Sequence, residues 1–329
     1  MNFFHMNNEY EIVKFNQYNF PEGARTTTCP ICSSTRKKKY EKCMSLDWNR
    51  GLGTCHHCGK TIQLHLWKRV NNTSISNYYP QIKATSNYEF QILPKEYIPT
   101  NEYIDKSNLF KFLLTKFREE DVRKVFSLYY VGTSKHWIND DGYSTKFPQM
   151  DINGKLRQLK VIAYNPITGK RLHKEDSAQL FSNGKYITDI FQQKVWFAGK
   201  SLLNNPNPSF KQCFFGEHIL SKSSLPVAVV ESEKTAIVCA LSFFQYTWIA
   251  TGGKNGCRWT NEEVFSVLKN KKVILFPDLD CYEEWKEKAK DLKDAGIDIS
   301  INISIQSITE KENLTGNWDI ADLILAGKI

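Results

Sequence analysis

Four cysteines near the start of the chain have the spacing of a metal site. Cys29 and Cys32 form one C-x₂-C pair, and Cys55 and Cys58 form a second pair after 22 intervening residues. Two such pairs, each presenting two thiolates from a tight turn, can close a tetrahedral site of four sulfur ligands. We therefore predict a structural Zn²⁺ ion at these four cysteines, in a closed site that contributes folding energy and takes no part in catalysis.

Two histidines and a fifth cysteine lie close to these pairs. His56 and His57 stand between Cys55 and Cys58 and could replace a thiolate, while Cys43 lies between the two pairs. Four thiolates are the simpler ligand set.

The chain has nine cysteines, an odd number that would leave one thiol unpaired in an oxidising compartment. It shows no apolar run of about 20 residues and no signal-peptide core, so we predict a cytoplasmic protein with reduced thiols.

Carboxylates follow two apolar stretches in the last third of the chain. Residues 226–230 predict a buried strand that ends at Glu231, and residues 272–276 predict another that leads to Asp278 and Asp280. Acids placed where a buried strand leaves the core are costly unless they bind cations. Oxygen ligands at this density suit Mg²⁺ or Mn²⁺.

A third acidic element, Asp319 and Asp322, lies near the C-terminus. An acid after a strand can also serve simply as a helix N-cap, and Asp280 could have that role alone. The repetition of the pattern favours a divalent-metal site over a set of unrelated caps.

The elements that position these acids alternate between strand and helix. Strands are expected at 226–230, 247–250 and 272–276, an extended stretch at 297–305, and helices at 233–244, 261–269, 282–295 and 320–325. Such alternation predicts a parallel sheet with flanking helices, whose ligands gather at the carboxyl ends of the strands. The fold class is therefore α/β, and α+β overall once the preceding part of the chain is included.

The middle of the chain differs from both ends. Residues 88–225 hold a helical pattern at 108–128 and a β-hairpin about the turn Asp151–Gly154. Residues 71–87 are polar and rich in Asn and Ser, which predicts a linker. We expect a zinc domain at 22–70, this linker, a basic subdomain at 88–225 and an α/β domain at 226–329.

Charge is unevenly spread over these segments. Residues 1–85 carry 12 basic and 5 acidic side chains, whereas residues 226–329 carry 12 and 16. A basic N-terminal part and an acidic C-terminal part are typical of a protein that binds a polyanion with the first and divalent cations with the second. Random scatter in a basic protein would look similar.

Basic and aromatic side chains near the cysteines suit a single nucleic-acid strand. Lys37, Lys38 and Trp48 could contact phosphates and stack on bases, although the basic run could equally be a solvated hairpin. Residues 251–256 are Gly-rich but lack the spacing of a phosphate-binding loop, so a tight turn is favoured there. Phosphate contact through Lys254 is the alternative.

The sequence resembles the DnaG-type and phage primases. Glu231 followed by Asp278-x-Asp280 resembles the acidic motifs of the Toprim domain, which primases share with topoisomerases and related nucleases. The run from the first C-x₂-C to CHHCGKTIQLHLW resembles the primase zinc ribbon. The segments Phe147–Lys155 and Lys211–Gly216 resemble two segments of the primase polymerase core. The order of zinc ribbon, linker, basic subdomain and Toprim domain is that of a primase.

This resemblance implies roles for individual residues. Glu231, Asp278 and Asp280 would be catalytic and would hold Mg²⁺ or Mn²⁺, with Glu231 also assisting proton transfer. Asp319 and Asp322 match the late acidic motif of the family. The side chains expected to track template or nucleotide phosphates are Lys155, Arg157, Lys160 and Lys211. The family motif has a second acid where this chain has Thr235; Glu233 could replace it or could merely start the helix.

The function implied is a DNA primase-like nucleotidyltransferase that makes short RNA primers on single-stranded DNA from NTPs. We expect a separate replicative helicase as partner and an origin in a plasmid, phage or other mobile element. A Toprim nuclease would use the same carboxylates to direct water at a phosphodiester and would need no NTP. A non-catalytic DNA-binding protein would bind DNA even without the acids.

Overall fold

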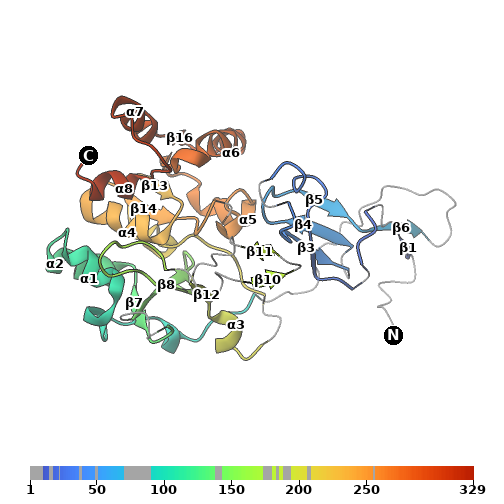
Figure 1. Cartoon of the computed structure of the whole chain (residues 1–329), viewed down its shortest axis with the longest axis horizontal. Coiled ribbons are helices and arrows are strands. Elements are labelled where there is room, and N and C mark those ends of the chain that lie inside the picture. The colour runs from blue at the N-terminus through green and yellow to red at the C-terminus, as the bar shows by residue number, and fades with distance from the viewer. Residues whose placement is uncertain are drawn as a thin grey trace. The chain divides into compact units, whose positions relative to one another are not determined.

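Two units make up the chain, Met1–Tyr88 and Glu89–Ile329 (Figure 1). The computed structural model describes residues 10–14, 18–21, 23–36, 39–48, 51–69, 90–137, 143–172, 180–182, 185–187, 194–205, 209–254 and 256–329. The expected linker at 71–87 lies outside the described residues.

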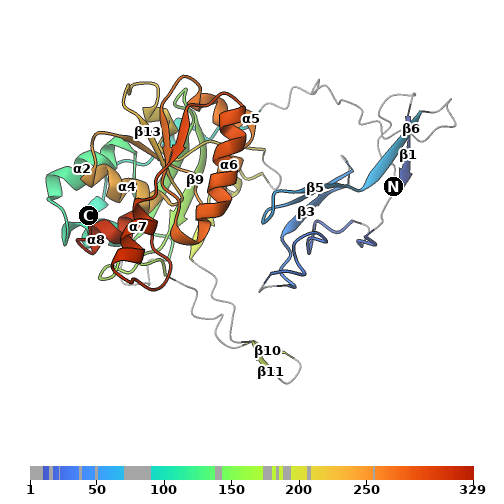
Figure 2. The same cartoon turned by 90° about the horizontal axis from the view of Figure 1, so that it is seen from above.

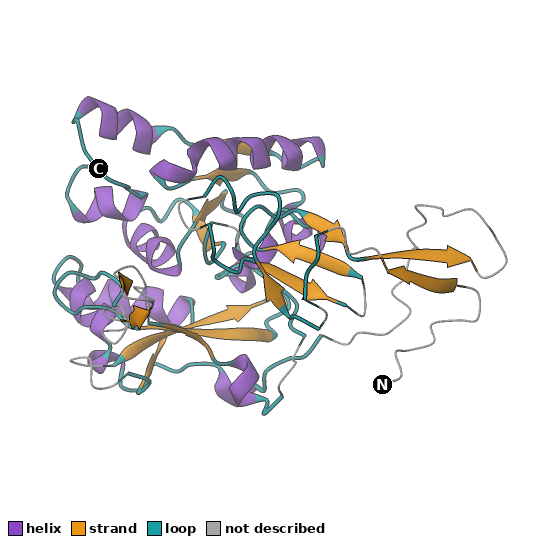
Figure 3. Cartoon of the chain, turned by 45° about the vertical axis from the view of Figure 1, so that its right-hand side comes forward, coloured by secondary structure: helices purple, strands orange, loops and turns teal. Residues whose placement is uncertain are grey.

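The described part of the first unit consists of strands and loops (Figure 3). Its antiparallel sheet has the order β2-β3-β4-β5. The strands are β2 (Thr26–Thr27), β3 (Met44–Asp47), β4 (Leu52–Cys55) and β5 (Thr61–Gln63), with a separate antiparallel pair of β1 (Tyr10–Lys14) and β6 (His65–Arg69). Met44, Leu46 and Leu64 are buried beside Cys29 and Cys55. So small a core needs a further source of stability, such as a metal.

The second unit contains an antiparallel sheet of order β12-β9-β8-β7. Its strands are β7 (Gly132–Ser134), β8 (Ser144–Met150), β9 (Leu156–Ile162) and β12 (Val195–Phe197); β10 (Leu180–Ser182) pairs with β11 (Lys185–Ile187). The predicted hairpin is confirmed, because β8 and β9 pair across a turn in which Gly154 N donates to Asp151 O at 2.8 Å. Gly154 has a φ of 72°, which glycine adopts at no steric cost.

Short helices accompany this sheet. They are α1 (Asn108–Leu114), α2 (Glu119–Leu128) and α3 (Gly199–Leu202), with 3₁₀ turns η1 (Lys95–Tyr97), η2 (Ile104–Lys106) and η4 (Glu217–Ile219). The single helical stretch expected at 108–128 is therefore wrong. Thr115 Oγ1 donates to Phe112 O at 2.7 Å at the end of α1, and Arg118 is extended before α2.

The predicted parallel sheet is confirmed, with the order β14-β13-β15-β16. Its strands are β13 (Val227–Val230), β14 (Thr247–Ala250), β15 (Val273–Leu275) and β16 (Ile299–Ile301). The helices are α4 (Glu233–Ser242), α5 (Glu262–Phe265), α6 (Tyr282–Asp294), α7 (Ser304–Lys311) and α8 (Ile320–Leu325), with 3₁₀ turns η5 (Gly256–Arg258), η6 (Ser266–Leu268) and η7 (Leu279–Cys281). The extended stretch expected at 297–305 was wrong beyond β16, because Asn302 Oδ1 accepts Ser304 N at 2.7 Å where α7 begins.

Helices cover both faces of this sheet. Ala228 and Val230 on β13 belong to the core cluster that includes residues of α4 and α8. Val227 and Val229 point the other way, into a cluster with residues of α5 and α6. Figure 2 shows α4 and α6 on opposite sides of β13. This alternation explains why β13 reads as a continuous apolar run.

The antiparallel and parallel sheets share one core. Phe147 from β8, Phe215 and Trp248 from β14 lie in the same buried cluster. Tyr129 Oη donates to Trp248 O at 2.7 Å. The expected boundary between residues 225 and 226 thus falls inside one compact unit. Among the described helices, none is long and apolar enough to cross a membrane.

Candidate functional site

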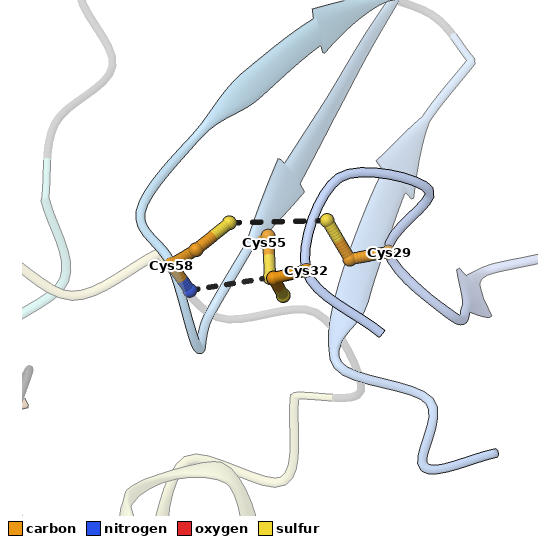
Figure 4. Close-up of side chains that lie close together, drawn as sticks. All are labelled: Cys29, Cys32, Cys55 and Cys58. Atoms are coloured by element: carbon orange, nitrogen blue, oxygen red, sulfur yellow. Dashed lines mark hydrogen bonds between the residues drawn. The ribbon is translucent and has the colours of Figure 1, made fainter. Parts of the chain in front are cut away.

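The four cysteines of the two C-x₂-C pairs meet in the first unit. Their sulfur atoms all lie within 4.8 Å of one another. Cys29 Sγ and Cys58 Sγ are 3.8 Å apart, and Cys32 Sγ and Cys55 Sγ are 3.7 Å apart (Figure 4). A tetrahedron of sulfur ligands about 2.3 Å from zinc has edges of about 3.8 Å. The spacing of the thiols therefore fits a Zn²⁺ ion, and the predicted ligands come together.

The groups around the cysteines support this ligand set. The backbone N–H groups of His57 and Cys58 donate to Cys55 Sγ at 3.3 and 3.4 Å. Burial and hydrogen bonds from neighbouring thiols raise the pKa of Cys32, so ionisation of that thiol calls for a bound cation. His56 instead contacts Ser45 Oγ through its ring. Cys55 Sγ donates to the Sγ of Cys43, which lies 3.7 Å away and outside the four.

The predicted acidic site lies at the carboxyl edge of the parallel sheet. Glu231 directly follows β13, and Asp278 follows β15. These two strands are parallel neighbours, with Val229 opposite Leu275. Their carboxyl ends therefore bring Glu231 and Asp278 to the same edge, which is where ligands bind in sheets of this kind.

Cys281 links two of these acids. Its Sγ lies 3.3 Å from Glu231 Oε2 and 3.3 Å from Asp280 Oδ1. Burial and the charge of Glu231 raise the pKa of Cys281, which keeps the thiol protonated and able to donate. Burial, and then the charge of Asp280, raises the pKa of Glu231.

Asp278 has the surroundings that best suit a bound cation. Burial, followed by the charges of Glu231 and Asp319, raises the pKa of Asp278 to about 8. Its Oδ1 is buried and accepts no hydrogen bond within the described residues. A divalent cation would satisfy that oxygen and offset the repulsion between carboxylates. Among the described residues, no three acids meet as tightly as the four thiols do.

Asp319 and Asp322 form a helix cap beside this edge. Asp319 Oδ1 accepts Asp322 N at 2.7 Å, and Asp322 Oδ2 accepts Asp319 N at 3.4 Å, a reciprocal capping box at the start of α8. Thr235 Oγ1 donates to Asp319 Oδ2 at 2.6 Å. Both carboxylate oxygens of Asp319 thus have protein donors, which favours a structural role for this acid over a metal ligand.

Two of the expected phosphate contacts are buried in ion pairs. Lys160 Nζ donates to Glu233 Oε1 and Oε2 at 2.8 and 3.0 Å and to Gly252 O at 3.0 Å. Arg157 donates to Asp151 Oδ2 at 2.8 Å. An ammonium has three N–H bonds, so Lys160 has none left for a phosphate in this arrangement. Glu233 binds Lys160 and does not replace the missing acid.

The remaining expected contacts are differently placed. Lys155 is exposed on the hairpin turn and Lys211 is half-buried. Lys254 pairs with Glu284 at 2.9 Å, and its charge counteracts the rise in the pKa of Glu231. Trp48 donates to Ala24 O at 2.7 Å and packs against the cysteine-rich core. Lys37 and Lys38 lie outside the described residues.

Sequence reasoning missed three cations beside the acidic edge. The charge of Arg171 counteracts the rise in the pKa of Glu231. Burial and Asp319 raise the pKa of Asp322, and the charges of Lys234 and Lys170 oppose that rise. For Lys170 and Arg171 the signal was the Asn-Pro-Ile-Thr-Gly turn at 165–169 directly before them.

The fold and its sites define an α/β protein with a candidate four-cysteine metal site and an acidic strand edge. A family model described as a domain of unknown function (DUF6371) matches residues 107–279, just over half of the chain. The chain therefore belongs to this family. No curated protein matches it.

Solved structures similar to the chain include primases. The primase fragment of the bacteriophage T7 primase–helicase is 14% identical over 92% of this chain and 95% of that chain, with a TM-score of 0.39. The zinc-binding and RNA polymerase domains of the Aquifex aeolicus primase are 13% identical over 89% and 79%, with a TM-score of 0.32. TM-scores below 0.5 assign no activity to this chain.

Proposed function

We propose that this chain is a metal-dependent nucleotidyltransferase of the primase type, which joins ribonucleotides into short primers on single-stranded DNA. The observation that carries the proposal is the placement of Glu231 and Asp278 after adjacent parallel strands, with a buried oxygen of Asp278 that has no donor among the described residues. The primase-like order of sequence motifs supports the same reading.

Nucleotidyl transfer requires mainly that the protein position the two substrates and stabilise the negative charge of the transition state. A 3′-oxygen forms a bond to the α-phosphorus of an NTP, the bond between that phosphorus and the bridging oxygen breaks, and pyrophosphate leaves. Glu231, Asp278 and Asp280 would hold Mg²⁺ or Mn²⁺, which would supply positive charge to stabilise the transition state. Glu231 has a raised pKa, which suits the carboxylate proposed to accept the proton of the 3′-hydroxyl.

Cations beside the acidic edge support an anionic substrate. The charges of Lys254 and Arg171 oppose the rise in the pKa of Glu231. The charges of Lys234 and Lys170 oppose the rise in the pKa of Asp322. These side chains could meet the triphosphate of an NTP. The basic first unit, with its cysteine site, would hold the DNA template, and a separate helicase would supply single strands.

Incubation with mixed-sequence single-stranded DNA, labelled NTPs and Mg²⁺ or Mn²⁺ tests the proposal. We expect short labelled RNA from the wild type and none from Asp278→Asn or Asp280→Asn. Asp294→Asn, at the exposed end of α6, is the matched control and should retain the product. Strand cleavage without NTP would instead identify a nuclease. DNA binding with neither reaction would contradict the enzyme and identify a non-catalytic binding protein.

A further inference from the structure

A hollow of about 390 Å³ opens on the antiparallel-sheet side of the second unit. It lies among η2, β7 and β8, and its chemically distinctive lining residues are Thr100, Glu102, Tyr103, Lys135, Tyr143 and Lys146. None of these belongs to the cysteine site, the acidic edge or the set of expected phosphate contacts. Its volume lies in the range of small-molecule sites.

Two tyrosine rings stand at this hollow. The Tyr103 ring is 52% exposed. The ammonium of Lys106 lies 5.1 Å from the centroid of the Tyr103 ring and 5.6 Å from that of Tyr143. One cation thus contacts both rings.

The backbone conformation of Tyr103 also suggests a ligand site. Its φ is 58° and its ψ is 24°, in the left-handed region. A bulky residue seldom adopts that conformation, which costs about 1–3 kcal/mol and tends to occur at ligand sites. The strained backbone would be explained if it presents the Tyr103 ring to a bound ligand.

Lys146 supplies a second, independent observation. Its side chain is half-buried, and that burial lowers the pKa of its ammonium. No described residue accepts a hydrogen bond from it or pairs with it. Lys135, which also lines the hollow, has no such partner among the described residues either. A partly desolvated ammonium without an acceptor is costly, and an anion in the hollow would remove that cost.

We propose that this hollow binds one nucleotide unit. The base would lie against Tyr103 and Tyr143, as bases do on aromatic platforms. The phosphate would meet Lys146 and Lys135, and the carboxylate of Glu102 would accept from a base amino group or a ribose hydroxyl. The unit belongs either to a free nucleotide or to a single strand. The site extends beyond the proposed catalysis and does not depend on it.

Photo-crosslinking tests the site directly. The full chain is irradiated with a single-stranded oligonucleotide that carries 5-iodouracil, which couples to aromatic side chains it touches, and the crosslinked peptides are mapped by mass spectrometry. A parallel reaction uses 5-iodo-UTP. We expect crosslinks at Tyr103 or Tyr143. Lys146→Met should reduce their yield at least about fivefold, while Lys290→Met, an exposed lysine of α6, should leave it unchanged.

Thermal unfolding separates a binding role from a structural one. Lys146→Met removes a half-buried ammonium without an acceptor, so its Tm should equal or exceed that of the wild type while the crosslink is lost. Crosslinks with the oligonucleotide alone would assign the site to a strand, and crosslinks with both reagents to nucleotides in general.

Two outcomes distinguish this site from the proposed function. Crosslinks confined to other parts of the chain, or none at all, would overturn the site and leave primer synthesis standing. Crosslinks at Tyr103 or Tyr143 in a protein that makes no primers would support the nucleotide site and contradict the proposed primase activity.

Discussion

Lys160 on β9 and Glu233 on α4 form an ion pair inside the second unit. Lys160 Nζ lies 2.8 Å from Glu233 Oε1 and 3.0 Å from Oε2, and the two side chains are 5% and 0% exposed. The pair joins the antiparallel sheet to the helix that begins two residues after Glu231. It therefore holds the start of α4, beside the acidic edge, against β9.

Breaking this pair from one side should destabilise the protein strongly. Lys160→Met leaves the Glu233 carboxylate buried without a counter-charge, so the free energy of unfolding should fall by about 3–5 kcal/mol in urea denaturation. The double variant Lys160→Met/Glu233→Gln should recover most of that loss. Lys155→Met, exposed on the hairpin turn, is the control. A single variant within about 1 kcal/mol of wild type would contradict a stabilising role for the pair.

Thr235 should matter through its hydroxyl. The side chain is 1% exposed, and its Oγ1 donates to Asp319 Oδ2 at 2.6 Å. Thr235→Val keeps the shape and removes the donor, so it should lower the free energy of unfolding by about 1.5–3 kcal/mol, the range for hydrogen bonds to charged groups. Thr235→Ser retains the hydroxyl and should cost clearly less. Equal losses in both variants would assign the effect to packing.

Glu217 should make stability depend on pH. Burial raises its pKa to about 7, against the opposing hydrogen bonds from Phe214 N and Ile152 N at 3.0 and 2.9 Å. A raised pKa means that the folded state binds the proton more tightly than the unfolded chain, whose pKa is near 4.5. Stability from this group is therefore complete below about pH 4.5 and falls as the pH rises toward 7.

The Glu217→Gln variant isolates this effect. Unfolding free energies at pH 5 and pH 7.5 should show the wild type losing about 1–3 kcal/mol relative to Glu217→Gln over that interval. Parallel pH profiles for the two proteins would mean that Glu217 is already ionised at pH 5 in the folded state.

The cysteine site should hold one zinc ion per chain. Metal analysis of the purified protein should find that ion, and Cys32→Ala should lose it and unfold the first unit, because structural zinc supplies folding energy. Cys43→Ser is the matched control, since Cys43 lies outside the four-thiol group. Zinc retained in Cys32→Ala would contradict the ligand set.

Local patterns predicted the elements better than they predicted the contacts. The hairpin turn at Asp151–Gly154 and the strand at Thr247–Ala250 were placed correctly because their signals lie within a few residues. The break between α1 and α2 was missed, since apolar residues keep the helical spacing through 108–128. The role of Lys160 could not be read from sequence, because its partner Glu233 lies 73 residues away. An exposed lysine and a buried one look alike until the fold brings an acid to one of them.

Mn²⁺ binding tests most directly whether the carboxyl edge of β13 and β15 holds divalent cations. The electron paramagnetic resonance signal of free Mn²⁺ would be followed during titration of the full chain, with Asp278→Asn as the test variant and Asp294→Asn as the control. We predict that the wild type and Asp294→Asn bind Mn²⁺ and that Asp278→Asn binds it at least about tenfold more weakly, a loss near 1.4 kcal/mol. Equal binding in all three proteins, or none in the wild type, would contradict the account.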